Sequence, residues 1–82
     1  MIQVFLSNSY QSKRQVQERH FYWMERVETF PNSPDVLYNA ALSALSVNKD
    51  ETALRLLQQA LSLDPLFSEA KNLQKQIIED GR

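Results

Sequence analysis

The chain has 82 residues, enough for one small domain whose core is thin, because such a chain buries only about 60–65% of its unfolded surface. The formal net charge of −1 divides into +1 over residues 1–30 (four basic, three acidic) and −2 over residues 31–82 (five basic, seven acidic), which excludes a basic footprint for nucleic acid or anionic lipid. The lack of cysteine excludes disulfides, thiolate catalysis and cysteine-ligated metals.

The composition favours helices throughout. One glycine and three prolines leave few places to interrupt a helix, and no run of alternating β-branched residues predicts a strand. We therefore expect an all-α protein with a single domain over residues 1–82. Within it, residues 1–30 form an N-terminal helix, and residues 31–82 form a helical hairpin followed by a capping helix.

Residues 1–30 carry a heptad-like pattern, in which seam residues recur at alternating spacings of four and three, with polar gaps. The pattern runs from Ile2 to Phe30, and its candidate contact between copies, called here the N-terminal seam, consists of Val16, His20, Trp23 and Val27. Two starts for the helix are open. Either Ser12 caps a helix that begins there, with Gln15 three residues on, or one long helix runs from about residue 3 to residue 29. We favour the long helix.

Four large side chains follow one another at residues 21–24 and span most of a helix circumference, so some of them face away from the core. We expect Trp23 to lie in the core together with Val27. Phe21 or Tyr22 then either anchors a partner, since aromatic residues dominate interface energetics, or packs within the chain.

The hairpin is predicted from its breakers and caps. A helix over residues 34–47 begins with Pro34, because proline suits the first helical turn. After a short turn, Asp50 is a natural cap for a second helix of good helix formers that reaches residue 63. This helix ends before Pro65, since the residue ahead of a proline avoids helical geometry.

The last predicted helix starts around residue 68, reaches Glu79 and stops at Gly81. One face of this helix is apolar and the opposite face is polar. The apolar stripe that defines this helix consists of Phe67, Ala70, Leu73 and Ile77. One apolar stripe against one polar face suits a capping helix at the end of a helical stack.

Pro31 and Pro65 stand 34 residues apart, and small or leucine side chains recur between them at spacings that suit two packed helices. These residues are Leu37, Ala40, Ala41, Ala44, Ala53, Leu57 and Ala60, and the phrase Ala60-Leu61-Ser62-Leu63-Asp64-Pro65 closes the segment. The pattern over residues 34–67 resembles the tetratricopeptide repeat. The resemblance implies a short right-handed solenoid of about four antiparallel helices, with one well-matched repeat, a degenerate preceding helix and a C-terminal capping helix.

A shift of 34 residues tests whether residues 16–30 belong to a preceding repeat. It sets Trp23 against Leu57, which suits such a repeat. It also sets two arginines against two small residues, Arg19 against Ala53 and Arg26 against Ala60. Large side chains at close-contact positions push helices apart, so we expect the preceding repeat to be at most half present.

By resemblance, the helix over residues 34–47 lines a groove that binds an extended peptide or a helix. The residues that would project toward such a ligand, called here the partner strip, are Tyr38, Asn39, Leu42, Leu45 and Ser46. Asn39 either pairs its amide with a ligand's main chain or is a solvated helix residue. The same helix is apolar all round, and we expect the flank with Tyr38, Leu42 and Leu45 to be covered by the N-terminal helix, a second copy or a foreign segment.

Two functions follow. The first is a non-enzymatic adaptor that binds a protein or peptide at the partner strip. The second is an assembly module, a homo-oligomer that buries the N-terminal seam and the helix over residues 34–47 between copies. No enzyme activity, cofactor, metal or nucleic-acid partner is expected, because a single histidine, His20, assembles no metal site or relay and no glycine-rich phosphate loop exists.

The first six residues are apolar but far short of the roughly 20 residues of a membrane span, and they lack the basic flank of a signal peptide. We therefore expect a cytoplasmic location without a span. Short repeat domains whose aromatic-rich first helix precedes a segment such as Phe30-Pro31-Asn32 look similar to those placed after the anchor of some bacterial envelope proteins. If residues 1–6 are the trimmed end of such an anchor, the location is membrane-proximal and the chain is a fragment of a longer protein.

Overall fold

The structure is a computed structural model that describes the backbone of residues 2–80 and the side chains of residues 14–80. Over this part of the chain it contains four helices and no strand. The helices are α1 (Ile2–Thr29), α2 (Pro34–Ser46), α3 (Asp50–Leu63) and α4 (Ser68–Asp80). The all-α prediction is confirmed. The predicted stop at Gly81 lies outside the described residues.

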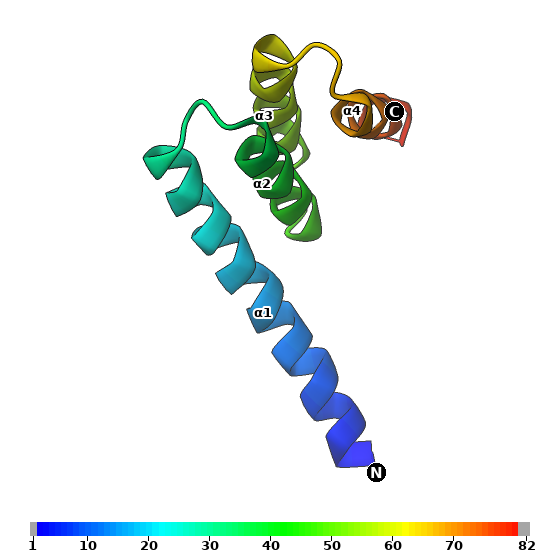
Figure 1. The fold of residues 1–82 in the computed structure, drawn as a ribbon. Coiled ribbons are helices and arrows are strands. Elements are labelled where there is room, and N and C mark those ends of the chain that lie inside the picture. Colours follow the sequence, from blue (N-terminus) through cyan, green and yellow to red (C-terminus); the bar gives the residue numbers. More distant parts are fainter. Residues whose placement is uncertain (1, 81–82) are drawn as a thin grey trace.

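The helices pack in chain order, each against its neighbour (Figure 1). The most extensive contact joins α2 and α3, α1 lies against α2, and α4 lies against α3 on the side of the hairpin away from α1. The pairs α1 with α2 and α2 with α3 run in opposite directions, whereas α4 is seen nearly end-on and crosses α3 (Figure 1). The chain therefore forms a stack with two open ends, one on α1 and the other on α4.

The N-terminal helix is continuous. α1 has 28 residues, so Ser12 lies inside the helix and the long-helix alternative is confirmed. At about 1.5 Å per residue such a helix is roughly 42 Å long. The hairpin covers only its C-terminal part, and the N-terminal part extends beyond the other helices (Figure 1).

The start of α2 is fixed by a cap that the sequence analysis missed. Ser33 is the N-cap, with extended backbone, and its Oγ accepts a hydrogen bond from the amide of Val36 at 3.4 Å. Pro34 follows as the first helical residue, where the missing N–H costs nothing. The predicted start at Pro34 is confirmed.

The turn from α2 to α3 depends on Asn48. The amides of Asn48 and Lys49 donate to the carbonyls of Leu45 (3.0 Å) and Ala44 (2.9 Å), which satisfies two carbonyls at the end of α2. This arrangement requires a left-handed backbone at Asn48, whose φ is 65°. Asparagine tolerates this conformation better than most residues with a side chain, so the turn reverses the chain within three residues.

The predicted cap of α3 is wrong. Lys49 is the N-cap and makes no side-chain capping hydrogen bond, while Asp50 is already the first helical residue. The left-handed turn at Asn48 brings the chain into the helix one residue earlier than the capping pattern predicts. The carboxylates of Asp50 and Glu51 still lie in the first turn, where they interact favourably with the positive end of the helix dipole.

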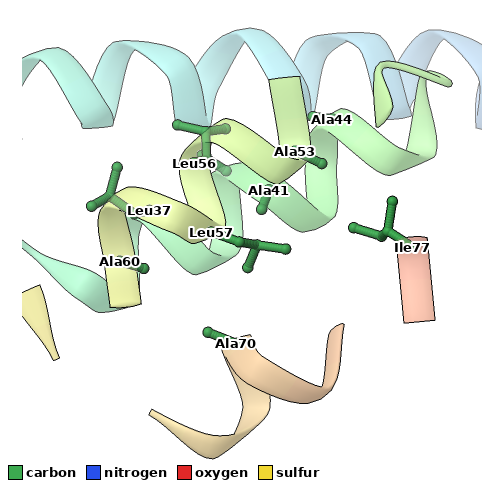
Figure 2. Close-up of a cluster of buried hydrophobic side chains, with 10 residues drawn as sticks. Leu37, Ala41, Ala44, Ala53, Leu56, Leu57, Ala60, Ala70 and Ile77 are labelled. Carbon is green, nitrogen blue, oxygen red and sulfur yellow. The ribbon is translucent and has the colours of Figure 1, made fainter. Parts of the chain in front are cut away.

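The core lies between α2 and α3 and is built mostly from small residues (Figure 2). Five alanines of α2 and α3 are fully buried, so the two helix axes approach closely. Leu37 and Leu57 are the largest fully buried side chains. From α4, Ala70 and Ile77 point toward Leu57 and close the core on that side (Figure 2). The predicted apolar stripe of the last helix is confirmed.

Candidate functional site

The partner strip occupies one continuous arc of α2. At about 100° per residue, its five residues fall on the side of α2 opposite the buried Leu37, Ala40 and Ala44. They are not equally accessible. Tyr38, Asn39 and Leu45 are half-buried, whereas Leu42 and Ser46 are exposed. The structure thus gathers the predicted residues on one surface and divides that surface into a covered edge and an open edge.

The covered edge corrects an expectation. The ring of Tyr38 packs on the ring of Phe67, with centroids 5.2 Å apart, and Leu45 packs against the core. The sequence predicts that the N-terminal helix, a second copy or a foreign segment covers this flank. In the structure, Phe67 of the same chain partly covers it. Period and spacing within one helix carry no information about a contact between residues so far apart in the chain.

The open edge is the outward surface of α2. Leu42 is 39% exposed and is the one large exposed hydrophobic residue of this helix. The polar members bond to their own helix. The Asn39 side-chain amide donates to the carbonyl of Asp35 at 3.0 Å, and Ser46 Oγ donates to the carbonyl of Leu42 at 3.3 Å. An asparagine amide has a second N–H and a carbonyl oxygen, so Asn39 keeps the groups needed to pair with a main chain.

A shallow hollow of about 210 Å³ lies next to the covered edge, where α2, α3 and α4 meet. Its lining residues are Leu45, Asp50, Leu73, Gln76, Ile77 and Asp80. The hollow combines an apolar floor with two carboxylates. Asp80 also lies at the C-terminal end of α4, whose last turn has no basic residue, so the helix dipole adds to the negative potential there.

The N-terminal seam lies against α2 within the chain. Between residues 14 and 29, the half-buried side chains are Val16, His20, Trp23, Met24 and Val27, all on one side of α1. Trp23 and Val27 pack against the core, as predicted. In this structure the described part of the seam is therefore an intramolecular contact, and its burial between copies remains a prediction.

His20 makes the polar contact between α1 and α2. Its Nδ1 lies 3.1 Å from Oγ of the buried Ser43, a residue that the sequence analysis did not single out. Because Ser43 Oγ donates its own proton to the carbonyl of Ala40 at 2.7 Å, the histidine Nδ1–H is the donor to Ser43. Desolvation, with a smaller contribution from the charge of Lys49, lowers the pKa of His20 below 6.5.

The lowered pKa of His20 predicts a pH-dependent stability. At pH values between the pKa of His20 in the folded protein and 6.5, the unfolded chain binds more protons than the folded one. The contribution of His20 to the free energy of unfolding therefore rises with pH in this range and is constant above about 6.5. We expect His20→Gln to remove this rise, since an amide can still donate to Ser43 and does not titrate. Urea unfolding of both proteins from about pH 5 to 8 measures it. Equal slopes in the two proteins would contradict the assignment.

Other kinds of site find no support in the described part of the chain. No group of three or more histidine, aspartate or glutamate side chains gathers there to hold a metal ion. Within the same residues, none of the helices is both long and apolar enough to cross a membrane.

Comparison with protein-family models and with curated proteins finds no match for this chain.

Proposed function

We propose that the protein is a non-enzymatic interaction module of the tetratricopeptide-repeat type, which binds a short segment of a partner protein along the partner strip. The exposure of Leu42 carries this proposal. Leu42 is 39% exposed on an otherwise well-packed helix, beside half-buried Tyr38 and Leu45 that already supply a supported apolar edge. An apolar side chain placed next to a preformed edge suits an anchor residue of a ligand.

The side chains that line the hollow indicate which class of peptide would bind there. Leu45, Leu73 and Ile77 offer apolar surface, while Asp50 and Asp80 add carboxylates at the same place. A lysine or arginine buries its aliphatic stem on apolar surface and keeps its charged end near carboxylates. The preferred ligand is therefore a peptide segment in which an apolar residue lies near a lysine or arginine.

The placement of the N-terminal seam supports the adaptor over the assembly module. Trp23 and Val27 already pack against the core of the same chain, so separating α1 from α2 to form a seam between copies would expose them. The partner strip needs no such rearrangement to receive a ligand.

We predict that Leu42→Asp weakens peptide binding without unfolding the protein. A random peptide library selected on the wild-type protein yields candidate ligands, and titration of the best one compares the variants. We expect Leu42→Asp to weaken binding at least about tenfold, which corresponds to 1.4 kcal/mol, because a carboxylate replaces the apolar anchor. Chemical-shift changes on α2 and α4 locate the ligand.

Leu63→Asp is the matched control, because Leu63 is 44% exposed and belongs to α3 rather than to the partner strip. It should bind the selected peptide like wild type. Peptides that bind Leu42→Asp as tightly as wild type, or shifts confined to α1, would reject the partner strip as the binding site.

A further inference from the structure

Three exposed aromatic residues lie at the C-terminal part of α1 and just after it, and one of them, Tyr22, lies on the side of α1 that faces away from α2. Phe21 is 65% exposed, Tyr22 47% and Phe30, just beyond the helix end, 49%. Residues 21–30 thus carry three of the seven large exposed hydrophobic side chains found in the described part of the chain. The corresponding face of α3 behaves differently. A shift of 34 residues sets Tyr22 against Leu56, which is buried.

Charges are arranged in two edges along this outer face of α1. At about 100° per residue, Tyr22 lies on the outer face between two pairs of charged residues. Glu18 and Glu25 lie along one edge, on the side of Phe21, and Arg19 and Arg26 lie along the other. All four charged residues are exposed. Next to Tyr22 the outer face is therefore acidic at Glu18 and Glu25 on one side, where the exposed Arg14 lies further out, and basic at Arg19 and Arg26 on the other.

The basic edge is preorganised. The Arg26 guanidinium lies over the ring of Tyr22, 5.1 Å from its centroid, and over the ring of Phe30 at 5.8 Å. Arg26 Nε also donates to Tyr22 Oη at 3.2 Å. These contacts use one N–H of the guanidinium and restrict its motion, which lowers the entropy cost of a further bond to a carboxylate. Stacked tyrosine and arginine side chains are typical of interface hot spots.

The charges on this face suit a second copy of α1 in one direction and not in the other. When two identical helices pair in parallel, the two-fold axis runs along them, and each edge of one helix faces the opposite edge of the other. The acidic edge with Glu25 then meets the basic edge with Arg26 of the second copy, and Tyr22 meets Tyr22. When the helices pair antiparallel, equal edges meet, and like charges repel.

We propose that the outer face of α1 binds a second copy of this chain, with the two α1 helices parallel. This interface goes beyond the proposed peptide site, because it lies on a different helix and leaves the partner strip free. It also differs from a dimer through the N-terminal seam, since Trp23 and Val27 stay packed against the core in each copy. The result is a pair of modules joined side by side, with two partner strips.

Charge-reversed variants test the complementarity. We expect wild type to pass from a 9.6 kDa monomer to twice that mass over about a hundredfold range of concentration, measured by light scattering after size exclusion. Glu18→Lys with Glu25→Lys makes both edges basic, and Arg19→Glu with Arg26→Glu makes both acidic. Each double variant alone should dimerise at least about tenfold more weakly than wild type, and a 1:1 mixture should form a heterodimer.

A cysteine cross-link tests the parallel direction, which is convenient because the chain has no cysteine of its own. Gln15 is exposed and lies two helical turns before Tyr22 on the same face, so two Gln15→Cys chains meet at the axis only in a parallel pair. We expect mild oxidation to give a disulfide-linked dimer. Ser62→Cys, exposed on α3, is the control and should stay monomeric.

The outcomes that overturn the proposal are specific. A wild-type monomer at all concentrations excludes the dimer, and a dimer that both charge-reversed variants keep excludes this interface. A cross-link between Gln15→Cys and Thr29→Cys chains, without one between two Gln15→Cys chains, excludes the parallel direction. Loss of the dimer in Leu42→Asp would move the interface to α2. Circular dichroism of each variant verifies that the helices remain formed.

Discussion

Leu57→Ala should destabilise the protein by about 3 kcal/mol, because fully buried leucine-to-alanine substitutions cost roughly 2.7–5 kcal/mol. Leu57 is fully buried where α2, α3 and α4 converge, and it is one of the two largest side chains in a core made mainly of alanines (Figure 2). Alanine neighbours have no side-chain freedom with which to fill the cavity. A domain of this size has a total stability of roughly 4–12 kcal/mol, so this one substitution removes a large part of it.

The measurement is urea unfolding followed by circular dichroism, supported by the thermal midpoint, which should fall by roughly 12–24 °C at about 4–8 °C per kcal/mol. Leu66→Ala is the matched control. Leu66 is 86% exposed in the turn between α3 and α4, so its truncation should change stability by no more than about 0.5 kcal/mol. Equal effects of the two substitutions would mean that Leu57 is not the centre of the core.

The fold was largely predictable because its signals are local. Pro34 and Pro65 bound the hairpin, the alanines mark the close contact, and the stripe from Phe67 to Ile77 marks α4. The errors are also local. The structure places the helix start at Asp50 itself, because the left-handed turn at Asn48 depends on geometry that a capping pattern does not include.

The candidate site was predictable only in part. Spacing along one helix correctly groups Tyr38 with Leu42 and Leu45, but it contains no information about Phe67, which covers Tyr38 from 29 positions further along the chain. The contact between His20 and Ser43 was missed for the same reason, since each residue is unremarkable within its own helix. Long-range pairing of this kind is decided by how the helices pack.

Arg19 and Arg26 affect the outer face of α1 in two ways, through their size and through their charge. Arg19 and Arg26 stand where a repeat of the α3 kind has alanines, and in the structure no helix of the described chain packs on that side of α1. Their bulk does not suit the close contact that the alanines make between α2 and α3, and their charge suits the carboxylates of the second copy proposed above.

The contact between α1 and α2 depends chiefly on Trp23, and we expect Trp23→Ala to destabilise the protein by about 2 kcal/mol. Complete burial of tryptophan would make the loss roughly 3–5 kcal/mol, and Trp23 is half-buried. The ring packs against the core, and Tyr22 adds an edge-on contact at 5.1 Å. Few other large side chains join α1 to the hairpin, so the substitution should release α1 before α2, α3 and α4 unfold.

Hydrogen exchange distinguishes this local release from global unfolding. In Trp23→Ala, amides of α1 between residues 14 and 29 should lose protection more than those of α3. Phe21→Ala is the control, because it removes a neighbouring aromatic side chain that is 65% exposed, and it should leave both helices as protected as in wild type. Both variants are compared at concentrations where light scattering gives the monomer mass. Equal loss of protection in α1 and α3 would mean that α1 is an integral part of one cooperative core, and that the seam stabilises the hairpin as well as holding α1.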